Sequence, residues 1–274
     1  MENLLLYVVR LAHEAGDAIL DVLHSDNLDT ELKEDHSPVT QADKKASRII
    51  VEGLKTFGWP VISEEEHIPD YSVRKHWDRL WIVDPLDGTK EFINRSADFT
   101  VNIALVENNR TILGVVYAPQ MHVFYFGAQG VGAYRMNLPE ADGVPSTWEE
   151  LKNRTVQLPV CTDRTKYVIV GSRSHMNAET KAYIGAVMSE RGQENVELVI
   201  RGSSLKFCIM AEGKADLYPR FSHIMEWDIA AGHAVAEVAG CKVTLPDGVS
   251  PILYNKEDLF APYFLVKGPS AQKM

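Results

Sequence analysis

Two aspartates stand three residues apart in the run Asp84-Pro85-Leu86-Asp87-Gly88-Thr89. The apolar stretch Trp81 to Val83 comes directly before them, and the proline prevents a helix from continuing through this point. Two carboxylates and the Leu86 carbonyl form the hard-oxygen set that Mg²⁺ prefers. The same spacing also fits a strand that ends in an aspartate turn, followed by a helix N-cap.

Other acidic residues stand beside apolar runs elsewhere in the chain. Glu64, Glu65 and Glu66 follow the apolar pair Val61-Ile62, and Asp228 precedes Ile229-Ala230-Ala231. Taken singly, the glutamates fit a solvated acidic turn and Asp228 fits a helix N-cap. Collected around a cation, these carboxylates would escape their mutual repulsion. Residue types and spacing indicate a Mg²⁺ site and leave the simpler alternatives open.

The composition is that of an ordinary globular protein. The chain has 274 residues, 45% of them hydrophobic and 24% charged, and a formal net charge of −10. This negative balance argues against non-specific nucleic-acid binding and against an anionic membrane surface. A small phosphorylated substrate remains compatible with it, because metal ions supply positive charge locally.

We expect this chain to have neither a membrane-spanning segment nor a targeting segment. Its longest aliphatic or aromatic run, Leu4 to Val9, is too short to span a bilayer, and no basic region opens the sequence, so we expect neither an integral membrane segment nor a signal peptide. The 3 cysteines show no CxxC spacing, which supports neither a disulfide framework nor a zinc site and favours a cytoplasmic protein.

Periodicity predicts an α+β arrangement in the first half. Apolar residues recur at helical spacing from Leu4 to Leu23, and a capping box at Thr40 to Asp43 should begin a second helix that stops near Gly58. Short β-rich runs follow at 61–62, 80–83, 100–106, 111–117 and 123–126. Asn108-Asn109 fits a hairpin turn, so we expect an antiparallel sheet.

The second half alternates strands with helices, which is typical of an α/β arrangement. We expect strands at 168–170, 196–200, 215–218 and 242–245, and helices at 178–191, 204–212 and 229–239. Residues 136–165 show little periodicity and are interpreted as an insertion or a connection. The expected division is therefore an α+β half over 1–135, this connection, and an α/β half over 166–274.

Several motifs together resemble the inositol monophosphatase superfamily. The resemblance rests on three motifs, which occur in the same order as in the superfamily: Glu64-Glu65, Asp84 to Thr89, and Trp227 to Gly232. Within the superfamily the chain is more similar to the CysQ-type 3′(2′),5′-bisphosphate nucleotidases. The segments behind this second likeness are 172–175, 202–208, 211–220 and 225–228.

The resemblance implies a fold and a set of site residues. The implied fold is a layered αβαβα sandwich with the site between its two halves. The implied Mg²⁺ ligands, for two or three ions, are Glu64, Asp84, the Leu86 carbonyl, Asp87 and Asp228. Asp43 and Thr89 would orient and help to deprotonate a water, and Glu65 would support a more weakly held metal. Backbone N–H groups of Gly88 and Thr89 would hold the scissile phosphate.

Residues of the second half are expected to choose the substrate. Ser174 and His175 follow the strand at 168–170, at the edge of a sheet where α/β proteins usually bind ligands. Ser203, Ser204 and Lys206 open a helix and could hold a second phosphate. The alternatives are a helix cap for Ser204, a solvated side chain for Lys206 and a structural hydrogen bond for His175. Arg220 fits a surface charge equally well.

The expected function is that of a Mg²⁺-dependent phosphatase. The resemblance implies removal of the 3′-phosphate of adenosine 3′,5′-bisphosphate by a metal-activated water, with AMP as product and 3′-phosphoadenylyl sulfate as a further substrate. This reaction belongs to sulfur metabolism, and the family is lithium-sensitive. Two alternatives stay open: an inositol monophosphatase or related phosphomonoesterase, and a catalytically silent Mg²⁺- or nucleotide-binding protein. The expected location is cytoplasmic, with peripheral attachment to the inner face of the membrane left open, and no protein partner is indicated.

Overall fold

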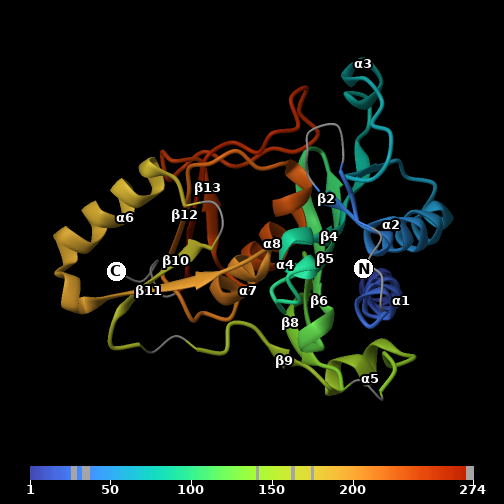
Figure 1. The fold of residues 1–274 in the computed structure, drawn as a ribbon, viewed down its shortest axis with the longest axis horizontal. Coiled ribbons are helices and arrows are strands. Elements are labelled where there is room, and N and C mark those ends of the chain that lie inside the picture. Colours follow the sequence, from blue (N-terminus) through green and yellow to red (C-terminus); the bar gives the residue numbers. More distant parts are fainter. Residues whose placement is uncertain (26–29, 33–37, 140–141, 162–163, 174–175, 270–274) are drawn as a thin grey trace.

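Helices and β-sheets alternate through the molecule in five layers (Figure 1). The structure is a computed structural model that describes residues 1–25, 30–32, 38–139, 142–161, 164–173 and 176–269. From the N-terminal side, the layers are a helix pair, a seven-stranded sheet, a second helix pair, a five-stranded sheet and an outer helix. The αβαβα sandwich implied by the family resemblance is confirmed.

The larger sheet has the strand order β3-β4-β5-β6-β7-β8-β9. Its strands are β3 (Val61–Ser63), β4 (Arg79–Asp87), β5 (Thr100–Glu107), β6 (Arg110–Ala118), β7 (Val123–Ala128), β8 (Gly132–Asn137) and β9 (Val156–Gln157). Only the β3–β4 pair is parallel among these described strands. The predicted hairpin joins β5 to β6, and Asn108 and Asn109 adopt the positive φ angles, 50° and 62°, that such a turn requires.

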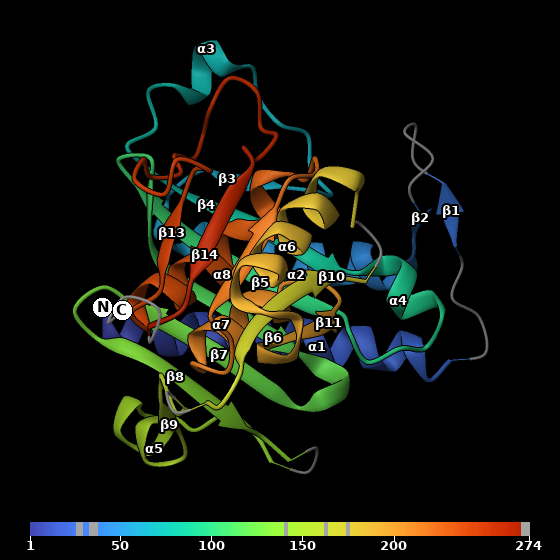
Figure 2. The same ribbon diagram turned by 90° about the vertical axis from the view of Figure 1, so that its left-hand side faces the viewer.

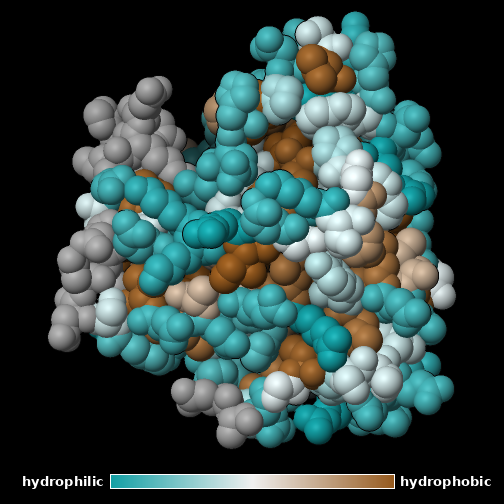
Figure 3. Space-filling model, turned by 90° about the vertical axis from the view of Figure 1, so that its right-hand side faces the viewer, coloured by the Kyte–Doolittle hydropathy of each residue, from teal (hydrophilic) through white to brown (hydrophobic). Residues whose placement is uncertain are grey.

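Two amphipathic helices cover the outer face of this sheet. Helix α1 (Glu2–Leu23) packs on β5, β6 and β7, and α2 (Gln41–Leu54) packs on α1 and β4. The predicted capping box begins α2: the Thr40 N–H donates to Asp43 Oδ2 over 2.7 Å, and the Thr40 hydroxyl accepts from Ala42 N over 3.1 Å. On the side of the molecule where these helices lie, hydrophilic residues predominate, interrupted by separate hydrophobic spots (Figure 3).

The smaller sheet has the order β11-β10-β12-β14-β13. Its strands are β10 (Tyr167–Ser172), β11 (Val196–Arg201), β12 (Leu217–Arg220), β13 (Lys242–Thr244) and β14 (Phe264–Lys267). Strand β10 is parallel to β11 and β12, as the strand–helix alternation predicts, whereas β14 runs antiparallel to both of its neighbours. Helix α6 (Ala178–Arg191) lies over the outer face of this sheet (Figure 2).

The central layer consists of α7 (Leu205–Ala211) and α8 (Glu226–Val238). Helix α8 packs on β4, β5 and β6 of the larger sheet, and α7 packs on β10, β12 and β14 of the smaller one. Small residues on α8 allow a close approach: a Cβ added to Gly114 of β6 would lie 2.3 Å from the Ala231 carbonyl oxygen and 2.8 Å from Ala234 Cβ. Gly114 therefore sets how closely α8 approaches the sheet.

The segment expected to be an insertion or a connection contributes to the first sheet and its core. It contains α5 (Trp148–Asn153), which begins at a Thr147–Glu150 capping box, and β9, which pairs with β8. The side chains of Trp148 and Leu151 are buried in the same core as α1. An isolated aromatic and leucine in a proline-containing stretch gave no periodic signal, which is why the sequence did not predict this helix.

Several short elements complete the fold. They are α3 (Tyr71–Arg74), α4 (Thr89–Ile93) and the paired strands β1 (Glu31–Leu32) and β2 (Pro38–Val39). Strands β8 and β14 were also not predicted from the sequence. Among the described residues, no helix combines the length and hydrophobicity that crossing a bilayer requires.

The close contact at Gly114 generates a stability prediction. We expect Gly114→Ala to lower the free energy of unfolding by about 1–3 kcal/mol, because the added methyl group overpacks the β6–α8 contact. Urea denaturation monitored by circular dichroism measures the change.

The control is Gly185→Ala in α6, where an added Cβ meets nothing within 4 Å. This substitution should leave stability unchanged or raise it by about 0.5–1 kcal/mol, because alanine loses less backbone entropy in a helix. Equal stability of Gly114→Ala and the wild type would contradict the assigned role of this contact.

Candidate active site

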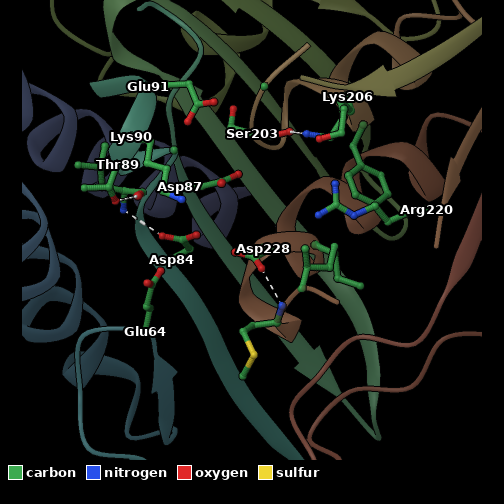
Figure 4. A pocket seen from close by; sticks show the side chains of 18 of the residues that line it. Glu64, Asp84, Asp87, Thr89, Lys90, Glu91, Ser203, Lys206, Arg220 and Asp228 are labelled. Carbon is green, nitrogen blue, oxygen red and sulfur yellow. Dashed lines mark hydrogen bonds between the residues drawn. The ribbon is translucent and has the colours of Figure 1, made fainter. Parts of the chain in front are cut away.

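A cavity of about 420 Å³ opens between the end of β4 and the first turns of α7 and α8. Its lining combines acidic side chains from the larger sheet and α8 with basic side chains from the α7–β12 region, as Figure 4 shows. The described lining residues with ionisable side chains are Glu64, Asp84, Asp87, Lys90, Glu91, Lys206, Arg220, His223 and Asp228. The cavity thus lies between the two sheets.

A bulge in β4 brings Asp84 and Asp87 together. Three residues apart on a regular strand, they would point to opposite faces. In the structure Asp84 pairs with Asn102 and Asp87 pairs with Thr100, so β4 holds one more residue than β5 between these pairs. We expected β4 to end at Asp84; the strand instead continues through Asp87, and its bulge turns both carboxylates into one cavity.

Three carboxylates meet at the cavity. Asp84, Asp87 and Asp228 each place an oxygen within 4.8 Å of the others. Glu64, in the turn after β3, also lines the cavity, and its backbone N–H donates to the Val83 carbonyl over 3.3 Å. Figure 4 shows the Glu64 and Asp84 side chains side by side at one end of this group.

Burial and mutual repulsion raise the pKa values of these acids. Burial raises the pKa of Asp84 well above its usual value, and Glu64, Asp87 and Asp228 add repulsion. Burial and the Asp87 charge raise the pKa of Asp228 to about 7. For Asp87, burial raises the pKa, and the Lys206 charge partly offsets it. Without a cation, the cluster resists full ionisation at neutral pH.

The donor set fits a hard divalent cation. Asp84 Oδ1 accepts from the Leu86 N–H over 3.1 Å, but Asp84 Oδ2 is buried and has no hydrogen-bond partner among the described residues. A buried carboxylate oxygen left unpaired is costly unless a ligand completes it. Oxygen ligands from two or more carboxylates are what Mg²⁺ prefers, so the residues present could hold this ion.

A hydrogen-bonded chain links Asp43 to the turn after β4. The Thr89 hydroxyl donates to Asp43 Oδ1 over 3.1 Å and lies 3.3 Å from the Leu86 carbonyl oxygen. The other oxygen of Asp43 accepts from the Thr40 hydroxyl and N–H, both over 2.7 Å. Gly88 precedes Thr89 with φ +95°, and a Cβ there would lie 3.0 Å from a backbone oxygen of residue 98, so glycine suits this turn.

Basic side chains occupy the opposite wall. Lys206 is buried, and burial lowers its pKa to about 8, with Asp87 acting in the opposite direction. Arg220 is also buried and lines the cavity, and its Nε has no hydrogen-bond partner among the described residues. The alternatives of a solvated Lys206 and a surface Arg220 are therefore wrong. The buried Ser203 hydroxyl, which lines the same wall, has no described partner either.

Ser204 and Asn102 connect the two halves beneath the cavity. Ser204 is the N-cap residue of α7, but its side chain makes no cap bond. Its hydroxyl instead donates to the Asp228 carbonyl over 2.9 Å and accepts from Asn102 Nδ2 over 3.0 Å. Asn102 Nδ2 also lies 3.4 Å from Asp87 Oδ2. Asn102 was not predicted as a site residue, although an asparagine inside the apolar run of β5 was a signal for it.

The other expected site residues occupy different positions. Asp228 is the third residue of α8 rather than its N-cap, and its Oδ2 accepts from the Met225 N–H over 2.7 Å. Glu65 lies in the turn beside Glu64, outside the cavity lining. Asp43 contacts the Thr89 hydroxyl, and the Ser204 hydroxyl contacts Asn102 and the Asp228 carbonyl. Ser174 and His175 lie outside the described residues.

Known proteins match this chain along almost its whole length. The profile of the inositol monophosphatase family matches residues 1–271. The 3′(2′),5′-bisphosphate nucleotidase CysQ of Escherichia coli (strain K12) is 44% identical over 256 residues, which cover 92% of this chain and 94% of that protein. The crystal structure of CysQ from Bacteroides thetaiotaomicron is 43% identical, with a TM-score of 0.88 and coverage of 98% of both chains. A Thermotoga maritima IMPase shares the fold, with a TM-score of 0.70 at 24% identity over 97% of this chain and 92% of the other. On these matches, the chain belongs to the inositol monophosphatase family.

Proposed function

We propose that this protein removes the 3′-phosphate of adenosine 3′,5′-bisphosphate, with AMP and phosphate as products and Mg²⁺ as cofactor. The observation that carries the proposal is the meeting of Asp84, Asp87 and Asp228 within 4.8 Å, beside a cavity with basic residues on its other wall. Relatives at 44% and 43% identity are named CysQ, and the first is a 3′(2′),5′-bisphosphate nucleotidase, which supports this substrate. We extend the proposal to 3′-phosphoadenylyl sulfate, whose ribose carries the same 3′-phosphate.

The acid cluster is the proposed metal site. Glu64, Asp84, Asp87, Asp228 and the Leu86 carbonyl would hold two or three Mg²⁺ ions, and the buried unpaired oxygen of Asp84 supports this assignment. When bound, Mg²⁺ neutralises the carboxylates, attracts the phosphate dianion and lowers the pKa of a coordinated water. Without this charge, the acids would repel the phosphate.

Thr89 and Asp43 are proposed to orient the attacking water. Because the Thr89 hydroxyl donates its proton toward Asp43 and the Leu86 carbonyl, its oxygen lone pairs remain available to accept a hydrogen bond from water. Asp43 in turn accepts two hydrogen bonds from Thr40, which hold its carboxylate in place. Glu65 is proposed to support this water from the turn after β3. Backbone N–H groups of Gly88 and Thr89 are proposed to hold the transferred phosphate.

The basic wall is proposed to hold the second phosphate. Lys206 keeps most of its positive charge at pH 7, because its pKa is about 8. Arg220 and Ser203 line the cavity with polar atoms that have no described hydrogen-bond partner. A 5′-phosphate would satisfy these groups, and Ser204 would position them through its bonds to Asn102 and Asp228. Ser174 and His175 remain proposed contacts from the end of β10.

Removal of one metal ligand tests the chemistry. We expect Asp87→Asn to lower kcat by about a thousandfold or more, because the charge that helps to hold the metals is lost. The fold should remain, since asparagine is nearly isosteric and removes a charge that repels Asp84 and Asp228. Phosphate release and far-UV circular dichroism measure the two effects. Near-normal turnover at saturating Mg²⁺ would show that Asp87 is not a ligand.

The stabilising effect of Mg²⁺ should increase as pH rises. The pKa of Asp228 is about 7 in the folded protein, above its value near 4 in an unfolded chain, so the metal-free folded state binds more protons between these values. Stability without metal therefore falls as pH rises through this window. Because protons and Mg²⁺ compete for the carboxylates, Mg²⁺ binding strengthens in the same direction.

Melting curves with EDTA or with saturating Mg²⁺, recorded from about pH 5 to about pH 8, test this dependence. The Mg²⁺-induced rise in Tm should be larger at the upper end, and Asp228→Asn should reduce the difference. A Tm shift of equal size at every pH would mean that no titrating carboxylate takes part in metal binding.

Lys206 should discriminate between substrates with one and two phosphates. We expect Lys206→Met to reduce kcat/KM for adenosine 3′,5′-bisphosphate at least about tenfold more than for adenosine 3′-monophosphate, because only the former carries the 5′-phosphate. Any effect of the substitution on Asp87 cancels in the ratio of the kcat/KM values for the two substrates. Equal losses for both would place Lys206 outside the second phosphate site.

A further inference from the structure

Two exposed aromatic rings line the mouth of the cavity. Phe260 lines the cavity although 48% of its surface is exposed, and His223 lines it from the segment that precedes α8. The two ring centroids are 5.6 Å apart, with an interplanar angle of 72°. On its other side, the His223 ring lies 5.9 Å from that of Tyr263. His223, Phe260 and Tyr263 thus form a small aromatic cluster, and the first two of them line the cavity.

The backbone of Phe260 is held on both sides of its side chain. Its N–H donates to Asp258 Oδ1 over 2.9 Å, and its carbonyl accepts from Lys256 Nζ over 2.7 Å. Phe260 also forms a β-bridge with Met225, the residue before α8. These contacts hold the backbone of Phe260 in place, while 48% of the residue's surface is exposed.

A buried carboxylate anchors this arrangement. Lys256 Nζ donates to Glu226 Oε1 over 2.7 Å, and the side chain of Glu226 is only 1% exposed. Glu226 Oε2 also accepts from the Asn255 N–H over 2.6 Å. Because Glu226 is the first residue of α8, the segment from Asn255 to Phe260 is attached directly to the helix that carries Asp228.

Met225 connects the aromatic cluster to the acid cluster. Met225 pairs with Phe260 through its backbone, and the same residue donates its N–H to Asp228 Oδ2 over 2.7 Å. A substrate with its phosphate at the carboxylates therefore lies near the rings. Phosphates and a ribose gain little from an aromatic face, whereas a nucleobase stacks on one.

We propose that Phe260, flanked by His223, is the platform on which the base of the nucleotide stacks. This proposal rests on the proposed nucleotidase function and adds to it the group that recognises the nucleoside. Alanine substitution of a stacking aromatic typically weakens binding of a base about fivefold to a hundredfold. A phenylalanine side chain has only two torsion angles, so it loses little conformational entropy on binding, which suits it to this role.

The test compares two substrates that differ only in the base. Adenosine 3′,5′-bisphosphate carries it, and the methyl riboside 3′,5′-bisphosphate lacks it while keeping both phosphates and the sugar. In Phe260→Ala we expect KM for the adenosine compound to rise about tenfold with kcat nearly unchanged, and KM for the base-free compound to stay constant. Phe260→Tyr keeps an aromatic face and should behave as the wild type.

The matched control is Leu253→Ala. Leu253 is 44% exposed in the loop that leads to Phe260 but does not line the cavity, so its removal should change neither KM. Calorimetric binding of AMP and of ribose 5-phosphate gives a readout that needs no turnover, and Phe260→Ala should weaken only AMP binding.

The outcomes separate this inference from the function on which it rests. If the wild type turned over neither bisphosphate, the proposed nucleotidase activity would be overturned. The AMP titration would then be the measurement that tests whether Phe260 contacts the base. Two results would overturn the proposal that Phe260 stacks on the base. One is that the wild type turns over both substrates with equal KM values. The other is that Phe260→Ala changes neither KM nor AMP binding. An equal loss for base-containing and base-free ligands would also overturn it, because Phe260 would then support the cavity without contacting the base.

Discussion

Three carboxylates that meet in one cavity repel one another, and this repulsion governs the rest of the site. Asp84, Asp87 and Asp228 place oxygens within 4.8 Å of one another, where two unit charges repel by about 3–4 kcal/mol at an effective dielectric constant near 20. Their raised pKa values are the direct consequence. A fold that assembles such a group gives up stability in the metal-free state, and a divalent cation converts the same geometry into a strong binding site.

The architecture around the carboxylates resists that repulsion. The bulge in β4 fixes two of the acids, and the first turn of α8 fixes the third, while Gly114 lets α8 lie close to the sheet. Ser204 and Asn102 then tie α8 to β5 through hydrogen bonds of 2.9 and 3.0 Å. Because each acid comes from a rigid element, the side chains cannot move apart freely. The same first turn of α8 anchors the segment that carries Phe260 at the rim of the cavity.

The sequence predicted those parts of the structure that depend on local patterns. Helical periodicity located α1, the capping box at Thr40 located the start of α2, and the two asparagines located the β5–β6 turn. The acid motif indicated which residues form the cluster, but not how residues 84 and 87 come to share a face, because a bulge depends on pairing with β5. Burial of Arg220 and the anchoring of Lys256 by Glu226 depend on long-range packing, which no local pattern encodes.

Anomalous diffraction from a crystal soaked in Mn²⁺, a close substitute for Mg²⁺, tests the central claim most directly. We expect at least one anomalous peak within bonding distance of Asp84, Asp87 and Asp228, with Asp84 Oδ2 among the ligands, since this is the oxygen without a described partner. A difference map without a peak between these side chains, with the carboxylates turned away from one another, would contradict it.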